Sequence, residues 1–173
     1  MFTDKIIKAI YARSVREEQF AAIQQFIKAT EGSKLLDIGT GNDRLLLKLK
    51  DSGLKLYAVD ITPPDRPRTI DEISLIGYSR IEEIFYPDDF FDCVTTIDTP
   101  ELWEDKMAAL TEIKRVMKAG AQFICVFGFD SKTGEGTPPR TLRAQARKAG
   151  FVNVSVKILR AEGRYLLTGE KPC

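Results

Sequence analysis

The stretch Lys34-Leu35-Leu36-Asp37-Ile38-Gly39-Thr40-Gly41-Asn42-Asp43-Arg44 decides the fold of this 173-residue chain. Its apolar run reaches a carboxylate at Asp37 and predicts a buried strand over about 34–38. Gly39 and Gly41 then allow a tight turn whose backbone amides are not shielded by side chains. A leucine-rich segment follows, and Asn42 or Asp43 is placed to cap a helix there. Such a turn lets backbone N–H groups approach a nucleotide-like ligand, although an ordinary strand-to-helix turn has a similar composition.

The composition is that of an ordinary soluble globular protein, with 43% hydrophobic and 29% charged residues. The 26 lysines and arginines nearly balance the 25 acidic residues, so the net charge favours neither nucleic acid nor a membrane surface as a partner. No apolar run approaches the about 20 residues that a membrane-spanning helix needs. The N-terminus lacks the apolar block of a signal peptide. We therefore expect a cytoplasmic protein.

Histidine is absent from the chain. This absence excludes nucleophiles activated by histidine, histidine general bases and metal sites with histidine ligands. The three cysteines show no metal-binding spacing: Cys93 and Cys125 lie in apolar strand patterns, and Cys173 is terminal. We interpret them as reduced structural thiols and expect no metal site.

Strands and helices alternate along the chain. Further strands are predicted over about 55–60, 74–79, 91–97, 121–127, 152–158 and 164–169, and helices over 3–12, 15–30, 43–50, 99–117 and from a Thr137 cap to Gly150. Pro63, Pro64 and Pro67 exclude a long helix between the second and third strands. This pattern predicts an open, mostly parallel α/β sheet with one antiparallel strand near the C-terminus. We expect a single domain over 1–173, with an N-terminal helical segment (1–32) and an α/β core (33–173).

Carboxylates fall at the ends of three predicted strands, at Asp37, Asp60 and Asp98. Ligands of open α/β sheets bind outside the carboxyl ends of the strands, where the strand order reverses. Asp60 lies 19 residues after Gly41, a spacing at which a carboxylate can accept hydrogen bonds from two ribose hydroxyls. A helix cap or turn is the alternative role for this aspartate.

Several segments, taken in order, resemble the class I S-adenosylmethionine-dependent methyltransferases, and in particular the small relatives of the ubiquinone/menaquinone methyltransferases. They are Leu-Asp-Ile-Gly-Thr-Gly at 36–41, Ala-Val-Asp at 58–60, Tyr-Pro-Asp-Asp-Phe-Phe-Asp-Cys-Val at 86–94, Leu-Thr-Glu-Ile-Lys-Arg-Val-Met-Lys-Ala-Gly at 110–120, and the closing segment 164–172. The resemblance covers about 15–170. It implies a Rossmann-like sheet with helices on both faces.

The resemblance also implies S-adenosylmethionine as the cofactor and assigns residues to it. Asp37, Gly39, Thr40 and Gly41 would hold its methionyl part, Asp60 its ribose, Ile61 the adenine face, and the Ile81 amide the adenine edge. Carboxylates at strand ends suit this cofactor because its sulfonium and amine are both positively charged.

The chain departs from the family pattern at two positions. Asp43 replaces a third glycine, and its carboxylate would weaken cofactor binding if it faced the methionyl carboxylate. It would be harmless if it capped the following helix. Arg80 stands beside the expected adenine position, where relatives often carry an acidic residue. A nicotinamide cofactor is the weaker alternative because the dinucleotide pattern requires glycine at Arg44.

Asp98 and Glu101 are the candidate catalytic residues, since both follow the fourth strand at the expected mouth of the site. Either can orient an amine or accept a proton. The alternative is that Thr99 and Glu101 only begin a helix.

We expect in-line methyl transfer to a small molecule, without specifying an oxygen, nitrogen or carbon acceptor. One alternative is a cofactor-binding protein that is non-catalytic or needs a partner. Another is an RNA methyltransferase that uses the basic helix face formed by Arg140, Arg143, Arg147 and Lys148. We favour the small molecule because such charged faces are most often only solvated.

Overall fold

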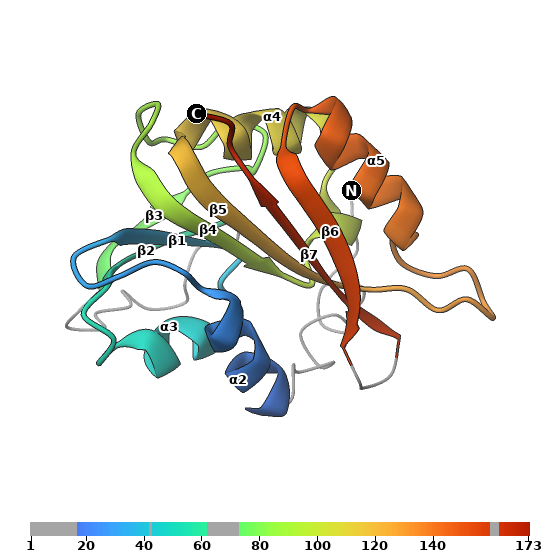
Figure 1. The fold of residues 1–173 in the computed structure, drawn as a ribbon, viewed down its shortest axis with the longest axis horizontal. Helices are drawn as coiled ribbons and strands as arrows, with labels where there is room; N and C mark the ends of the chain where they lie inside the picture. The colour runs from blue at the N-terminus through green and yellow to red at the C-terminus, as the bar shows by residue number, and fades with distance from the viewer. Residues whose placement is uncertain (1–16, 42, 62–72, 160–162) are drawn as a thin grey trace.

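Seven strands form one sheet in the order β3-β2-β1-β4-β5-β7-β6 (Figure 1). This computed structural model describes residues 17–41, 43–61, 73–159 and 163–173. β7 runs antiparallel to both of its neighbours, and the other described pairs are parallel, which confirms the predicted sheet. The strands are β1 (Lys34–Ile38), β2 (Lys55–Asp60), β3 (Ile73–Tyr78), β4 (Phe91–Ile97), β5 (Met117–Gly128), β6 (Val152–Leu159) and β7 (Arg164–Glu170).

Helices cover both faces of the sheet, as predicted (Figure 1). On one face α2 (Glu17–Phe26) and α3 (Arg44–Leu49) pack through Phe20, Ile23 and three leucines onto the inward side chains of the strands. On the other face lie α4 (Lys106–Val116) and α5 (Pro139–Lys148). β1 contributes to both cores, with Leu35 in one and Leu36 in the other, because successive side chains of a strand point to opposite faces. The helix expected over 3–12 and the prolines at 63, 64 and 67 lie outside the described residues.

The helix expected over 99–117 is interrupted. A short 3-10 helix, η1 (Pro100–Leu102), is followed by Trp103 in an extended conformation. Asp105 then caps α4 by accepting hydrogen bonds from the amides of Met107 and Ala108 at 2.8 and 3.0 Å. The apolar spacing continues across this break, which is why the sequence pattern predicted one helix.

Other boundaries differ by a few residues. α2 ends at Phe26 rather than near 30, and β3 begins at Ile73. α5 has Pro138, not Thr137, at its N-cap, and it begins at Pro139, whose ring already has the backbone angle of a helix start. Gly150 ends α5 with a positive φ, as predicted.

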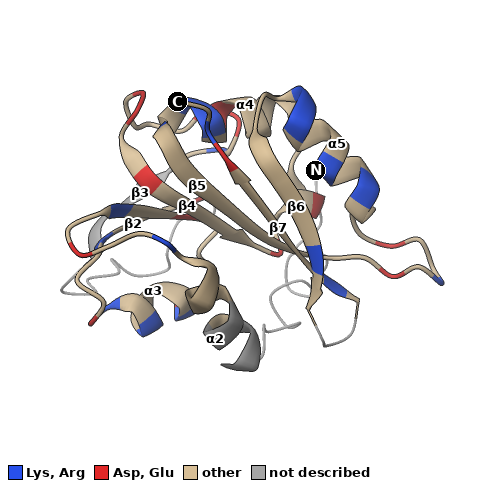
Figure 2. Ribbon diagram, in the orientation of Figure 1, with Lys and Arg blue, Asp and Glu red and all other residues tan. Residues whose placement is uncertain are grey.

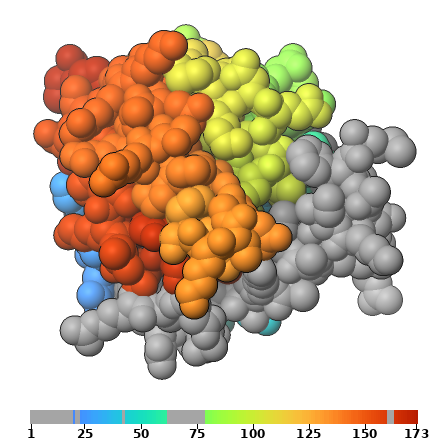
Figure 3. Space-filling view, turned by 90° about the vertical axis from the view of Figure 1, so that its right-hand side faces the viewer, coloured from blue at the N-terminus to red at the C-terminus, as the bar shows by residue number. Residues whose placement is uncertain are grey.

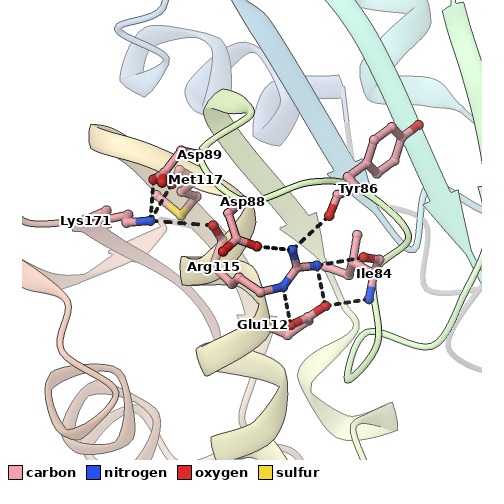
Figure 4. Close-up of polar contacts among 8 residues, drawn as sticks. All are labelled: Ile84, Tyr86, Asp88, Asp89, Glu112, Arg115, Met117 and Lys171. Carbon is pink, nitrogen blue, oxygen red and sulfur yellow. Dashed lines mark hydrogen bonds and ion pairs between the residues drawn. The ribbon is translucent and has the colours of Figure 1, made fainter.

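Arg115 fixes the loop between β3 and β4 from the last turn of α4 (Figure 4). Its guanidinium donates to the carbonyls of Ile84 and Tyr86 at 2.8 and 2.9 Å and pairs with Glu112 and Asp88 at 2.7 and 2.6 Å. Bidentate, charge-assisted contacts of this kind are stronger than neutral hydrogen bonds. The two segments 86–94 and 110–120 of the family resemblance therefore meet here, where they fix the entry into β4.

The two cysteines of the sheet are buried. Burial raises the pKa of the Cys93 thiol to about 12, and that of Cys125 is also raised by burial. Neither is suited to be a nucleophile, because the thiolate is the reactive form. No helix in the described part of the chain is long and apolar enough to cross a membrane.

Candidate functional site

The strand order reverses between β1 and β4, and the glycine turn follows β1 at this point. Gly39 and Gly41 have φ values of 70° and 57°, in the region that favours glycine. The Gly39 amide donates to the carbonyl of Val59 at 2.8 Å. The Gly41 amide donates to Oδ2 of Asp60 at 2.9 Å. The structure thus brings the turn and the end of β2 together, as the sequence spacing predicted.

Asp37 lies on β1 just before this turn and is a buried residue, only 3% exposed. Burial raises the pKa of Asp37 to about 7, while the hydroxyl groups of Thr95 and, to a smaller extent, Thr40 lower it. Thr95 donates to Oδ1 at 2.7 Å. The nearby carboxylates of Asp43 and Asp60 raise the pKa further. A cation beside Asp37 would offset the effects of burial and of the neighbouring carboxylates, and it would favour the charged form of Asp37.

Asp43 stands at the N-cap position of α3 with a φ of 58°. Its side chain makes no capping hydrogen bond, so the interpretation of Asp43 as a side-chain cap is wrong. Its Oδ1 accepts a hydrogen bond from the Thr40 hydroxyl at 2.9 Å within the turn, and the residue is buried. The carboxylate therefore lies in the same acidic neighbourhood as Asp37 and Asp60.

The expected adenine side is more open. The side chain of Ile61 is 61% exposed, and Ile81 is half-buried against the core. Arg80 forms ion pairs with Glu104 at 2.5 Å and with Glu82 at 3.6 Å. Its charge is therefore balanced by acidic side chains rather than left facing Ile61.

The two candidate catalytic carboxyl groups differ in their surroundings. Asp98 follows β4 with a φ of 57° and forms an ion pair with Arg164. Arg164 reaches it across Gly128, where an added Cβ would lie 3.3 Å from the guanidinium. Glu101, on η1, has a buried Oε1 with no hydrogen-bond partner among the described residues. Burial raises the pKa of Glu101, although the backbone amides of Glu101 and Thr137 and, less strongly, the charges of Arg164 and Lys106 counteract it.

Thr95 and Arg164 are the site residues that sequence reasoning missed. Thr95 lies opposite Asp37 in the β1–β4 register, a relation that becomes visible only once these strands are known to be neighbours. Arg164 begins β7 and reaches Asp98 only because β7 lies on the far side of β5.

A family model described as a methyltransferase domain matches residues 36–125, which include the glycine turn, Asp60 and Glu101. The chain belongs to this family. The sequence resemblance to class I S-adenosylmethionine-dependent methyltransferases is thereby confirmed, and the family assignment implies S-adenosylmethionine as the cofactor. No curated protein matches the sequence.

Solved structures share the fold of this methyltransferase-domain protein at low identity. A Haloferax volcanii protein in complex with the Trm112 methyltransferase activator is 18% identical with a TM-score of 0.71, and the match covers 92% of this chain and all of that one. A SAM-dependent methyltransferase from Thermotoga maritima is 19% identical with a TM-score of 0.70, covering 88% and 87%. The Haemonchus contortus phosphoethanolamine N-methyltransferase 2, bound to S-adenosylmethionine, is 14% identical with a TM-score of 0.72, covering 91% and 53%.

The residues at the turn fit the implied cofactor. Its sulfonium and amine are positive, and Asp37, Asp43 and Asp60 supply carboxylates within one electrostatic neighbourhood. The glycine turn has no side chain at Gly39 or Gly41 to obstruct a close approach. Asp43 adds negative charge that a third glycine would not, so the site favours the cationic groups of the cofactor over its carboxylate.

Proposed function

We propose that this protein transfers a methyl group from S-adenosylmethionine to a small molecule. Asp37, Gly39, Thr40 and Gly41 would bind the methionyl part, Asp60 the ribose, Ile61 the adenine face and the Ile81 amide the adenine edge. The observation that carries this assignment is the set of three carboxylates around a glycine turn, in a chain of the methyltransferase-domain family.

The cofactor supplies an electrophilic methyl group on a sulfonium, and the protein must then orient the nucleophile in line with the carbon–sulfur bond. Positioning of this kind provides much of the rate acceleration. Asp98 already pairs with Arg164, whereas Oε1 of Glu101 retains its acceptor capacity. Glu101 is therefore the better candidate to orient an N–H or O–H nucleophile and receive its proton, and Asp98 the better candidate to hold η1 in place.

The proposed function is tested with the unmodified protein and S-adenosylmethionine. A cell extract is divided into low-molecular-mass, RNA and protein fractions, and the S-adenosylhomocysteine formed with each is measured. We expect turnover with the low-molecular-mass fraction alone. Turnover only with RNA would replace the small-molecule substrate, and cofactor binding without turnover by the isolated chain would favour a non-catalytic or partner-dependent protein.

Glu101→Gln is expected to lower turnover about a hundredfold, the lower range for the loss of a general base. Cofactor affinity in calorimetry should stay unchanged, because Glu101 is not among the residues assigned to the cofactor. In the unmodified protein the rate should rise with pH through a pKa above 4.5, since burial raises the pKa of Glu101. Glu31→Gln, which changes an exposed glutamate before β1 in the same way, is the matched control. Equal turnover of the two variants would remove Glu101 from the reaction.

An RNA substrate is the second candidate, favoured by α5. Figure 2 shows basic residues along α5. The side chains of Arg140, Arg143, Arg147 and Lys148 are exposed, and none forms an ion pair with another described residue. The helix lies on the same face of the molecule as the segment containing η1 and α4 (Figure 3).

Three arginine–phosphate contacts would give a slope of about −2 in a plot of log affinity against log salt for single-stranded RNA. Fluorescence anisotropy with a labelled oligonucleotide measures this slope. Arg143→Glu should then weaken binding more than Lys50→Glu, a matched charge reversal at the end of α3. Salt-independent or absent binding would exclude RNA as the substrate.

A further inference from the structure

Thr99 packs its methyl group directly onto the glycine turn. Gly39 has a φ of 70°, and a Cβ built on it would collide with Cγ2 of Thr99. The residue that opens η1 therefore occupies the space that any other residue at position 39 would fill. This contact joins the loop after β1, which is assigned to the cofactor, to the loop after β4, which carries Glu101.

The Thr99 hydroxyl belongs to a buried chain of hydrogen bonds with one direction. The indole N–H of Trp103 donates to Thr99 Oγ1 at 3.0 Å. Thr96 Oγ1 donates to the carbonyl of Ile38 at 2.9 Å. Thr96 and Thr99 also share a hydrogen bond, and because a hydroxyl has only one proton, Thr99 must be the donor to Thr96. The chain thus runs from Trp103 through two threonines to the peptide that precedes Gly39.

These hydrogen bonds hold the two ends of η1, the segment that carries the proposed nucleophile-orienting residue Glu101. Trp103 is 5% exposed and follows η1, and Thr99 is 7% exposed and precedes it. Thr99 and Trp103 therefore fix both ends of the short helix on which Glu101 lies. A buried network whose members are all satisfied is rigid, so a displacement of the turn at Gly39 would have to change the hydrogen bonds that reach Trp103.

We propose that Thr99 is a positioning residue that couples the cofactor turn to η1, so that cofactor binding at Gly39 sets the place of Glu101 before the substrate arrives. This inference rests on the proposed function. The two parts of the Thr99 side chain have separate roles. The methyl group contacts the turn at Gly39, and the hydroxyl accepts the hydrogen bond from Trp103.

The coupling can be measured in the unmodified protein because Trp103 is its only tryptophan. S-adenosylhomocysteine is titrated while the tryptophan emission is recorded, and calorimetry measures binding in parallel. We expect the emission to change with the same dissociation constant that calorimetry gives. Binding in calorimetry with no change in emission would overturn the coupling while leaving the proposed function intact. No binding in calorimetry would instead contradict the proposed function.

Two variants separate the parts of the side chain. Thr99→Val keeps the methyl group and replaces the hydroxyl with a second methyl group, so the emission of the ligand-free protein should differ from that of the unmodified protein. Thr99→Ser keeps the hydroxyl and removes the methyl group, so the ligand-free emission should be normal. In both variants the emission response to the ligand should be lost and kcat should fall by about tenfold to a hundredfold, the cost of a misplaced group, with the cofactor dissociation constant little changed.

Thr111→Val is the matched control, since Thr111 donates to a carbonyl on the exposed side of α4. It should keep the full emission response and activity. A full emission response in both Thr99 variants would contradict the proposal. If neither variant folds by circular dichroism, the titration of the unmodified protein still decides it.

Discussion

Asp60→Ala is expected to weaken S-adenosylmethionine binding about a hundredfold in calorimetry. The carboxylate ends β2, is 5% exposed, and is oriented by the Gly41 amide at 2.9 Å. Hydrogen bonds to a charged group are worth about 1.5–3 kcal/mol each. Loss of the ribose hydroxyl contacts should therefore cost about 3 kcal/mol, which corresponds to about a hundredfold in affinity.

Two companions of this variant separate charge from hydrogen bonding. Asp60→Asn keeps an oxygen that can accept the Gly41 amide and should bind more tightly than Asp60→Ala. Asp51→Ala removes one negative charge at an exposed position after α3 and should leave the affinity unchanged. An Asp60→Ala protein that is folded and binds the cofactor with full affinity would show that the ribose lies elsewhere.

Asp37 is expected to make both stability and cofactor binding depend on pH near neutrality. Burial raises its pKa from 3.8 to about 7. Between pH 3.8 and about pH 7, Asp37 is protonated in the folded protein but ionised in the unfolded chain. The free energy of unfolding therefore falls as pH rises through this range. The loss is about 1.4 kcal/mol for each pH unit, or about 4 kcal/mol in all. Denaturant unfolding at several pH values measures it, and Asp37→Asn should lack this component.

The cofactor reverses the preference of this group, because a cation stabilises the ionised carboxylate. Affinity for S-adenosylmethionine should therefore rise with pH by up to tenfold per unit below about pH 7 and become constant above it. Asp37→Asn should bind weakly at every pH. A pH-independent affinity in the unmodified protein, or the same slope in the variant, would show that Asp37 is not beside the cofactor's positive charge.

The sequence was sufficient to predict the sheet and the carboxylates at the ends of its strands because both follow from local patterns. The run from Leu35 to Asp37 and the run that ends at Asp60 are apolar, end in carboxylates, and became β1 and β2 as expected. Helix α4 was predicted too long because Leu102 continues its apolar spacing across the break. The Asp105 cap that separates η1 from α4 is one of three consecutive polar residues, which also occur on the exposed side of a continuous helix.

The chemistry of the candidate site depended on contacts between distant residues. Asp98 and Glu101 look alike in sequence, yet Arg164 pairs with Asp98 from a strand 66 positions later. The sequence allowed Asp43 either to face a ligand or to cap a helix. The hydrogen bond that its carboxylate accepts from the Thr40 hydroxyl shows that the carboxylate lies within the turn. The raised pKa of Asp37 results from burial. None of these facts follows from spacing.

A crystal structure of the protein with S-adenosylhomocysteine tests the central claim most directly. We predict the ribose hydroxyls within hydrogen-bond distance of Asp60, the amino group of the ligand beside Asp37, and the adenine between Ile61 and the Ile81 amide. A ligand bound away from the Gly39–Gly41 turn, or an edge that remains empty at saturating ligand, would contradict it.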